Sequence, residues 1–330
     1  MRQVLYISAG LLLVSYMLTF LIRKIALKHS LLDIPNERSS HEIPTPRGGG
    51  IAIVISWFFG ISSLWHFNLL ETGLYLALLC GIILALVSFL DDIFTLPPFI
   101  RLMVQFISAL LALVCIKDIT PVSLSGLIIG NQVVLFTVAL VGIVWFINLF
   151  NFLDGIDGYA SLEAITVSLA FLIFTGDPLG LILIAPVTGF LIWNWPKAKI
   201  FMGDIGSTQL GFILAILGIY YHNEQQLHIL QWLMLTSLFW FDASLTLFRR
   251  WKNKEKLSVA HRKHAYQRVV QSGLSHKKTI LISLTLNIFI FSLIVISYKI
   301  DSLLIPMFIL NLLLLYLLTK FIDTKVPFEL

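Results

Sequence analysis

Long runs of hydrophobic residues, separated by short polar stretches, recur along the whole chain. Most runs are about 16–20 residues long, enough for a helix to cross a hydrocarbon core about 30 Å thick. Eleven are predicted as membrane-spanning helices, at residues 4–22, 50–67, 73–90, 99–116, 132–150, 158–175, 179–194, 208–221, 229–247, 279–298 and 302–320. The pattern predicts an all-α polytopic membrane protein, organised as a single domain over residues 1–330.

Basic residues lie almost entirely in the connections on one side of these predicted helices. Of the 23 lysines and arginines, 20 fall on that side, and only Arg2, Lys117 and Lys299 fall on the other. Cytoplasmic loops of membrane proteins carry an excess of Lys and Arg. The distribution therefore predicts a multi-pass protein of the inner (plasma) membrane, with its N-terminus outside and its C-terminus in the cytoplasm.

The composition agrees with a membrane protein and excludes two other classes. Hydrophobic residues make up 58% of the chain and charged residues 12%, whereas soluble domains carry about 25% charged residues. A soluble globule and a disordered protein are both excluded. The net charge of +5 reports orientation rather than nucleic-acid binding. Cys80 and Cys115 both lie in apolar runs, which excludes a disulfide scaffold and a Cys-rich metal site.

Acidic residues gather at the cytoplasmic ends of the predicted helices. One such acid alone would be an ordinary interfacial residue, but here five lie in separate stretches on a single face, most of them beside Gly or Asn. The first stretch ends a run with Asp91 and Asp92, followed by Arg101. Two adjacent carboxylates suit a divalent metal, or a pair in which one is tuned as a base. Arg101 would supply a guanidinium to an anion at the same surface.

Two further stretches combine acids with glycines. Asn151, Asp154 and Asp157 are spaced three apart, and each Asp is followed by Gly. If helical, the three side chains would share one face. Asp204 lies between glycines just before an apolar run, where backbone N–H groups of a helix N-terminus would point at an anion. Phe201 is either a membrane-facing aromatic or a stacking surface for a nucleobase.

The fourth stretch is basic and runs from His261 to Arg268, with the sequence His-Arg-Lys-His-Ala-Tyr-Gln-Arg. A zinc pair formed by His261 and His264 would lack its usual Cys or Glu partners. A clamp for a polyanion explains the cluster better. Arg47, just before three glycines, adds a further cation. Carboxylates suit Mg²⁺ and basic groups suit phosphates, so the residues predict Mg²⁺-assisted chemistry on phosphates at the cytoplasmic face of the membrane.

Taken together, these motifs resemble those of the polyprenyl-phosphate N-acetylhexosamine-1-phosphate transferases (glycosyltransferase family 4). The similarity extends in order through Asp91–Asp92, Asn148–Gly158, Phe201–Ser207 and His261–Arg268. The resemblance implies transfer of a HexNAc-1-phosphate from a UDP-N-acetylhexosamine to undecaprenyl phosphate, which releases UMP. The number of predicted spans, eleven, is similar to that of the branch that initiates O-antigen or common-antigen synthesis. The implied partners are these two substrates and membrane lipid. A nucleic-acid partner is not implied. The resemblance is compatible with a homodimer.

The resemblance also implies a role for each motif residue. Asn151 and Asp204 would hold Mg²⁺, with Mn²⁺ as the alternative ion. The implied catalytic residues are Asp91, Asp92, Asp154, His261 and His264. The implied substrate-binding residues are Arg47, Arg101, Asp157, Phe201 and Arg262. Asp157 and Phe201 would bind the uracil, Arg101 a phosphate, and Asp91 or Asp92 would orient or deprotonate the lipid phosphate.

Two departures bear on the sugar. The segment His261–Gln267 lacks the His-x-His or triple-His form of the best-known branches and looks like the subgroup that uses 6-deoxy sugars such as N-acetylfucosamine or N-acetylquinovosamine. The segment Pro44–Gly48 lacks the lysine of the pentapeptide branch. The alternatives are a UDP-GlcNAc transferase, a phospho-N-acetylmuramoyl-pentapeptide transferase and, in another class, a membrane transporter, whose polar breaks usually lie near the midplane.

Overall fold

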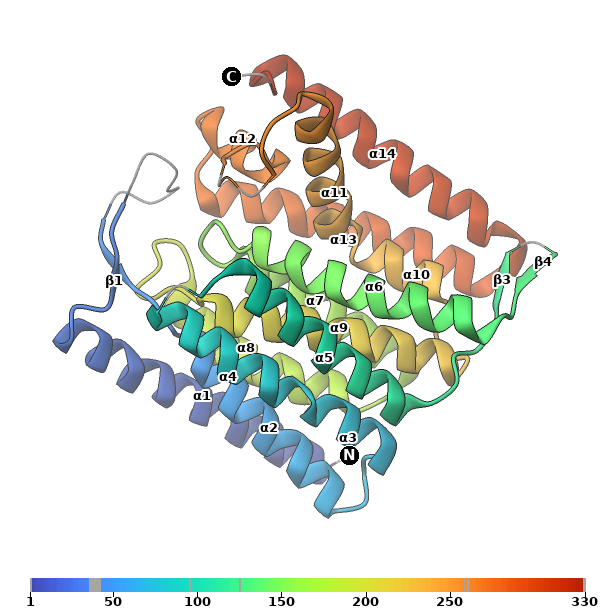
Figure 1. The fold of residues 1–330 in the computed structure, drawn as a ribbon, viewed down its shortest axis with the longest axis horizontal. Helices are drawn as coiled ribbons and strands as arrows, with labels where there is room; N and C mark the ends of the chain where they lie inside the picture. The colour runs from blue at the N-terminus through green and yellow to red at the C-terminus, as the bar shows by residue number, and fades with distance from the viewer. Residues whose placement is uncertain are drawn as a thin grey trace.

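The helices of the protein lie side by side in one bundle, and two short hairpins stand at its ends (Figure 1). The computed structural model describes residues 2–35, 43–94, 96–124, 126–257, 259 and 261–328. The helices are α1 (Arg2–Lys28), α2 (Gly50–His66), α3 (Thr72–Leu79), α4 (Gly81–Phe94), α5 (Pro98–Ile116), α6 (Gln132–Phe152), α7 (Tyr159–Thr175), α8 (Leu179–Asn194), α9 (Asp204–Asn223), α10 (Ile229–Leu235), α11 (Ser237–Lys252), α12 (Ala265–Gln271), α13 (His276–Lys299) and α14 (Leu304–Lys325). The antiparallel hairpins pair β1 (Leu32–Asp33) with β2 (Thr45–Pro46), and β3 (Val122–Leu124) with β4 (Leu127–Ile129).

The predicted all-α membrane architecture is confirmed. Within the described residues, seven helical stretches are long and apolar enough to cross a membrane, and the shorter helices α2, α7 and α8 are also apolar. The predicted span 229–247 is divided into α10 and α11 at Thr236. Eleven spans and the orientation remain predictions. Arg38, which contributes to the charge distribution behind that orientation, lies outside the described residues.

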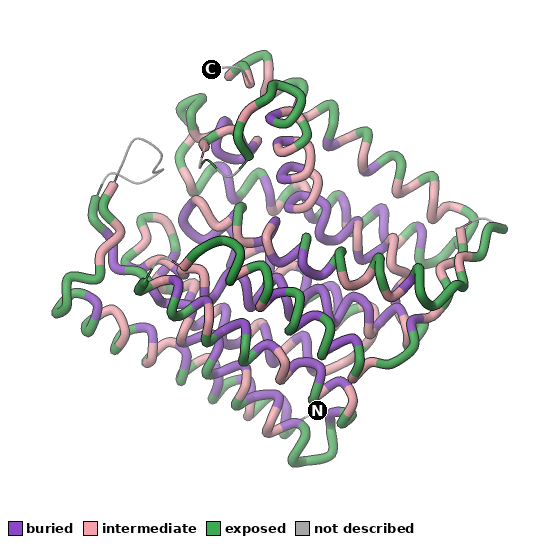
Figure 2. Tube along the Cα trace, viewed as in Figure 1, coloured by how far each residue is buried: buried purple, intermediate pink, exposed green. Residues whose placement is uncertain are grey.

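Helix α9 forms the centre of the bundle. In its most apolar stretch 94% of the residues are buried, against 22% for α1 at the edge, and Figure 2 shows the buried residues gathered in the middle of the molecule. Glycines permit this close packing: a Cβ on Gly206 would lie 2.8 Å from the Gly50 Cα, and one on Gly211 would lie 3.0 Å from the Ile147 Cα. Small residues at helix contacts serve the same purpose in other membrane proteins.

Both ends of α9 are fixed by hydrogen bonds. At its far end the backbone N–H of Thr120 donates to Asn223 Oδ1 at 2.9 Å. At its beginning, the backbone preceding α9 pairs with the segment that leads into α2. The N–H of Phe201 donates to the Pro46 carbonyl at 2.8 Å, and the N–H of Gly50 donates to the Met202 carbonyl at 2.8 Å. The start of α9 is therefore held in a fixed place beside α2.

Candidate active site

The carboxylate of Asp92, on the last turn of α4, caps the start of α9. Its Oδ1 accepts a hydrogen bond from the Asp204 N–H at 3.1 Å, and its Oδ2 accepts one from the Ile205 N–H at 3.3 Å. An anion is stabilised at this position by the free N–H groups and the helix dipole. The sequence predicted that these N–H groups would point at an anion. The structure supplies that anion from the chain itself, so this helix end is not open to a substrate phosphate.

Gly203 allows the carboxylate of Asp92 to approach the start of α9. Its φ is +78°, and a Cβ at this position would lie 2.8 Å from Asp92 Oδ2. Residues with a side chain rarely adopt such a backbone conformation. The glycine beside Asp204 is therefore required both by the turn and by the close approach of α4.

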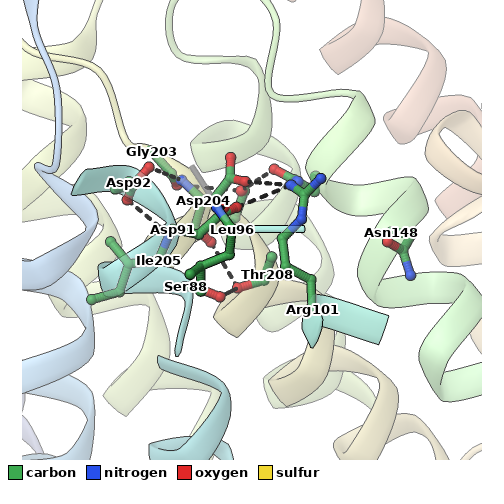
Figure 3. Close-up of polar contacts among 12 residues, drawn as sticks. Ser88, Asp91, Asp92, Leu96, Arg101, Asn148, Gly203, Asp204, Ile205 and Thr208 are labelled. Carbon is green, nitrogen blue, oxygen red and sulfur yellow. Dashed lines mark hydrogen bonds and ion pairs between the residues drawn. The ribbon is translucent and has the colours of Figure 1, made fainter. Parts of the chain in front are cut away.

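Arg101 lies between two acids that come from different helices. Its Nη1 is 3.0 Å from Asp91 Oδ2 on α4 and 3.4 Å from Asp204 Oδ2 on α9 (Figure 3). The other oxygen of Asp91 accepts a hydrogen bond from the Leu96 N–H at 2.6 Å. The side chain of Arg101 remains 38% exposed. It thus neutralises part of the acidic cluster and still offers a surface to an incoming phosphate.

Asn151 and Asp154 also lie near the start of α9. Helix α6 ends at Phe152, so Asp154 lies in a turn and the three-residue spacing does not form one helix face. Asn151 Oδ1 accepts a hydrogen bond from Ser207 Oγ at 2.7 Å. Burial, and then the charges of Asp204, Asp92 and Asp157, raise the pKa of Asp154 well above its usual range. Such crowding of carboxylates is relieved by a bound cation.

Asp157 connects three parts of the chain. It is buried, and its Oδ2 accepts a hydrogen bond from the Ala198 N–H at 3.1 Å and lies 3.2 Å from His276 Nδ1. His276 begins α13, and the sequence prediction missed it because a single histidine at a helix start has no distinctive pattern. Phe201 is half-buried at the end of the connection that contains Ala198.

The histidine segment is held by a second acidic cap. Asp242 on α11 accepts hydrogen bonds from the Ala265 N–H at 2.8 Å and from the Tyr266 N–H at 3.4 Å, at the start of α12. Its Oδ1 lies 3.7 Å from His264 Nδ1, and the rings of His264 and His261 are 4.8 Å apart. Burial, helped by the neighbouring charge of His264, lowers the pKa of His261 to about 3. His261 is therefore neutral near pH 7 and is not a cation of the predicted polyanion clamp.

Tyr266 connects the histidine segment to the acidic cluster. Its hydroxyl donates to the Phe152 carbonyl at 3.2 Å, and a Cβ on Gly155 would lie 2.0 Å from the same hydroxyl. Two predicted cations remain exposed: Arg262 and Arg47. Arg47 donates to the backbone carbonyl of Asp92. The structure therefore brings together these predicted residues: Arg47, Asp91, Asp92, Arg101, Asn151, Asp154, Asp157 and Asp204. The His261–His264 segment lies beside them.

The donor atoms suit a hard cation. Among the described residues, no group of three or more His, Cys, Asp or Glu side chains has the arrangement of a metal site made by the protein alone. Mg²⁺ is commonly bound by one or two carboxylates and completed by substrate phosphates and water. Asp204 and Asp154 offer carboxylates, and Asn151 offers an amide oxygen. The residues present therefore fit a Mg²⁺ ion that arrives with a phosphorylated substrate.

Known proteins with similar sequences are phosphotransferases that act on polyprenyl phosphates. Residues 74–222 match the family model described as glycosyl transferase family 4. A probable undecaprenyl-phosphate N-acetylglucosaminyl 1-phosphate transferase of Bacillus subtilis (strain 168) is 29% identical over 318 residues, which cover 93% of this chain and 88% of the relative. A decaprenyl-phosphate N-acetylglucosaminephosphotransferase of Mycobacterium tuberculosis (strain CDC 1551 / Oshkosh) is 27% identical and covers 86% of this chain and 79% of the relative.

A third relative, an undecaprenyl-phosphate alpha-N-acetylglucosaminyl 1-phosphate transferase of Thermotoga maritima, is 33% identical over 205 residues, which cover 62% of this chain and 61% of the relative. The fold, the acidic cluster and these matches define a membrane-embedded phosphotransferase. The match to glycosyl transferase family 4 and the similarity to these N-acetylglucosaminyl 1-phosphate transferases confirm the family predicted from the motifs.

Proposed function

We propose that this protein transfers a HexNAc-1-phosphate from a UDP-sugar to undecaprenyl phosphate at the cytoplasmic face of the plasma membrane. An oxygen of the lipid phosphate forms a bond to the sugar-linked phosphorus. The bond from that phosphorus to the bridging oxygen breaks, and UMP leaves with the electron pair. The observation that carries the proposal is the meeting of Asp91 of α4 and Asp204 of α9 at Arg101, with Asp154 of the turn after α6 close enough for the charge of Asp204 to act on it. The similarity to undecaprenyl-phosphate N-acetylglucosaminyl 1-phosphate transferases supports the same reaction.

In this proposal the acids divide into metal ligands and positioning residues. Asp204 and Asn151 hold Mg²⁺ with the help of Asp154, and the ion, when bound, neutralises the pyrophosphate of the donor. Both oxygens of Asp92 accept backbone N–H groups, and both oxygens of Asp91 are engaged by Leu96 and Arg101. We assign both residues a positioning role rather than that of a base. A phosphate monoester has a second pKa near 6, so the lipid phosphate is already mostly dianionic and needs no base.

The sugar has two candidates, and each depends on a different observation. The relatives named above are N-acetylglucosamine transferases, which supports UDP-GlcNAc. The His-x-x-His-Ala-Tyr-Gln form of residues 261–267 supports a 6-deoxy-HexNAc donor in O-antigen synthesis. Tyr266 and Gln267 are both buried and engaged in internal hydrogen bonds. Any discrimination between the sugars is therefore assigned to His261 and Arg262, which are more accessible.

The test is a reconstituted assay. Purified protein, undecaprenyl phosphate and Mg²⁺ are combined with UDP-GlcNAc, UDP-N-acetylfucosamine or UDP-N-acetylquinovosamine, and UMP release is measured with lipid-linked sugar as the second product. We expect one donor to exceed the others in kcat/KM by at least about tenfold, since one unpaired polar group costs about 1–3 kcal/mol. EDTA should abolish turnover. Absence of UMP release with every donor, from folded protein with Mg²⁺, would refute the proposed function.

A further inference from the structure

The C-terminal end of the chain is joined to the histidine segment by ion pairs. Asp323, on the last turns of α14, receives two arginines from different helices. Arg249 of α11 donates to both of its oxygens, at 3.0 and 2.8 Å, and Arg268 of α12 donates to Oδ1 at 2.6 Å. The side chain of Arg268 is only 2% exposed. A two-pronged pair with a carboxylate is among the strongest and most directional polar contacts.

The residues after α14 extend the same contact. Arg268 also donates to the Val326 carbonyl at 3.0 Å. The ring of Phe328 lies 5.1 Å from the Arg249 guanidinium carbon, 5.5 Å from that of Arg268 and 5.4 Å from Lys263 Nζ. Cations over an aromatic face are attracted to its ring electrons. We call Asp323, Val326 and Phe328 together the C-terminal clasp.

The other end of the loop between α11 and α12 is fixed by Arg250. This buried side chain donates to Glu255 Oε2 at 3.0 Å and to the carbonyls of Lys256 and Val259 at 2.7 and 3.0 Å. Glu255 Oε1 in turn accepts a hydrogen bond from Lys263 Nζ at 3.0 Å. Burial opposes ionisation of Glu255, but its hydrogen bonds with Arg250 and Lys263 hold its pKa below the usual range. Lys263 therefore links this anchor to the clasp.

The C-terminal clasp holds the part of the chain that faces the acidic cluster. Residues 261–264 lie between Arg250 and Arg268, and α12 carries Tyr266 onto the turn that contains Gly155. Helix α12 has only seven residues, too few to be stable alone. Its position depends on the Asp242 cap at its start and on the clasp along its length. Cap and clasp both act on α12, but only the clasp connects it to the end of the chain.

We propose that Asp323 is a positioning residue for the transfer reaction: through Arg268 and Arg249 the C-terminal clasp sets the place of His261 and Arg262 at the donor site. This inference rests on the proposed function. It assigns a task to a segment that lies beyond the motifs and beyond residues 74–222, which match the family. Loss of the clasp should loosen the loop and weaken binding of the UDP-sugar, while Mg²⁺ activation is unchanged.

The experiment compares Asp323→Asn with Asp301→Asn, a matched exposed acid at the other end of the α14 region. Two quantities are measured on full-length protein in lipid nanodiscs: the KM and kcat for the UDP-sugar, and the rate of tryptic cleavage at Lys254, Lys256 and Arg262. For Asp323→Asn we expect about a tenfold rise in KM, with kcat within about twofold, and cleavage at least about fivefold faster, since looser loops open more often. Asp301→Asn should match the wild type, and Asp323→Glu should recover most of the KM.

Three outcomes separate the possibilities. Faster cleavage with unchanged KM in Asp323→Asn would overturn the positioning role, because the loop would then move without consequence for the donor. Unchanged cleavage would overturn the clasp itself. A wild-type protein that releases no UMP would refute the proposed function, while faster cleavage would still support the clasp. If Asp323→Asn fails to fold, Arg249→Lys removes the fork but keeps the charge and should give the same changes at smaller size.

Discussion

Helices α9 and α12 begin in the same way but lie in different surroundings. At α9, Asp92 accepts the N–H groups of Asp204 and Ile205, and at α12, Asp242 accepts those of Ala265 and Tyr266. In each case an acid from an earlier helix binds two successive N–H groups. The α9 cap lies among further carboxylates, whereas the α12 cap faces His264. The same local device therefore builds an acidic centre in one place and fixes a histidine segment in the other.

The sharpest test of the acidic centre is removal of one of its metal ligands. Asp204→Asn should lower turnover by at least about 10³-fold, because the neutral side chain no longer attracts the cation that neutralises the pyrophosphate. UMP release at saturating Mg²⁺ gives the measurement. Asp118→Asn, at an exposed acid outside the site, is the control. Near wild-type turnover of a folded Asp204→Asn protein would remove Asp204 from the metal site.

The two caps can be weakened one at a time. Asp92→Asn should reduce kcat/KM by about 100-fold, because it alters the cap and the charge beside Asp204 together. Asp242→Asn should reduce kcat/KM by about tenfold, since it displaces only the histidine segment. The assay is UMP release over a range of UDP-sugar concentrations. Equal losses in the two variants would show that the caps do not differ as the structure indicates.

Two glycines with positive φ allow the effect of backbone strain to be measured apart from the effect of a steric clash. Gly203→Ala places a Cβ 2.8 Å from Asp92 Oδ2, whereas Gly273, with φ +98°, has no neighbour within 4 Å of such a Cβ. Both changes strain the backbone, at a cost of at least about 1 kcal/mol. Only Gly203→Ala should also displace Asp92 and lower turnover, by about tenfold or more. Thermal unfolding in detergent and UMP release are the two measurements. A loss of turnover in Gly273→Ala of the same size would contradict this view.

The smallest effect concerns pH. Since the pKa of His261 is lowered to about 3, this side chain is neutral in the folded protein throughout pH 5–8, and its protonation cannot shape activity in that range. His261→Gln should therefore change the level of kcat/KM but leave its pH profile parallel to that of the wild type. Profiles measured from pH 5.5 to 8.5 provide the check. A profile that loses an inflection near pH 6.5 in His261→Gln would show that His261 does titrate there.

Local patterns in the sequence predicted most of the helices and the acidic cluster. The apolar runs and the charges at their ends are local properties, so Asp91, Arg101, Asn151 and Asp204 could be found from them. The Asp92 cap could not, because it joins residues 112 positions apart in the chain. The division between α10 and α11 was also missed, since Thr236 lies in a continuous apolar run without Gly or Pro.

Residues that act through tertiary contacts gave no signal of their own. His276 and Asp323 are single polar residues near helix ends, and their importance depends on Asp157, Arg249 and Arg268, which come from distant parts of the chain. The histidine segment shows the opposite error. Its charges suggested a clamp for a polyanion, but burial makes His261 neutral and Arg268 is occupied by Asp323. A basic sequence does not reveal which of its charges are already paired.

Because both ends of α9 are fixed, the length of this helix sets the distance between the two sides of the bundle. Its first residue is held by Asp92 and its last by the backbone of Thr120, and almost all of the helix between them is packed. One inserted residue would advance the rest of the helix by about 1.5 Å and turn it by about 100°, which would swing Gly211 away from Ile147. A change in the length of α9 would therefore require its neighbours to repack. The distance between the acidic centre and the opposite side of the bundle is therefore set by the number of turns in α9.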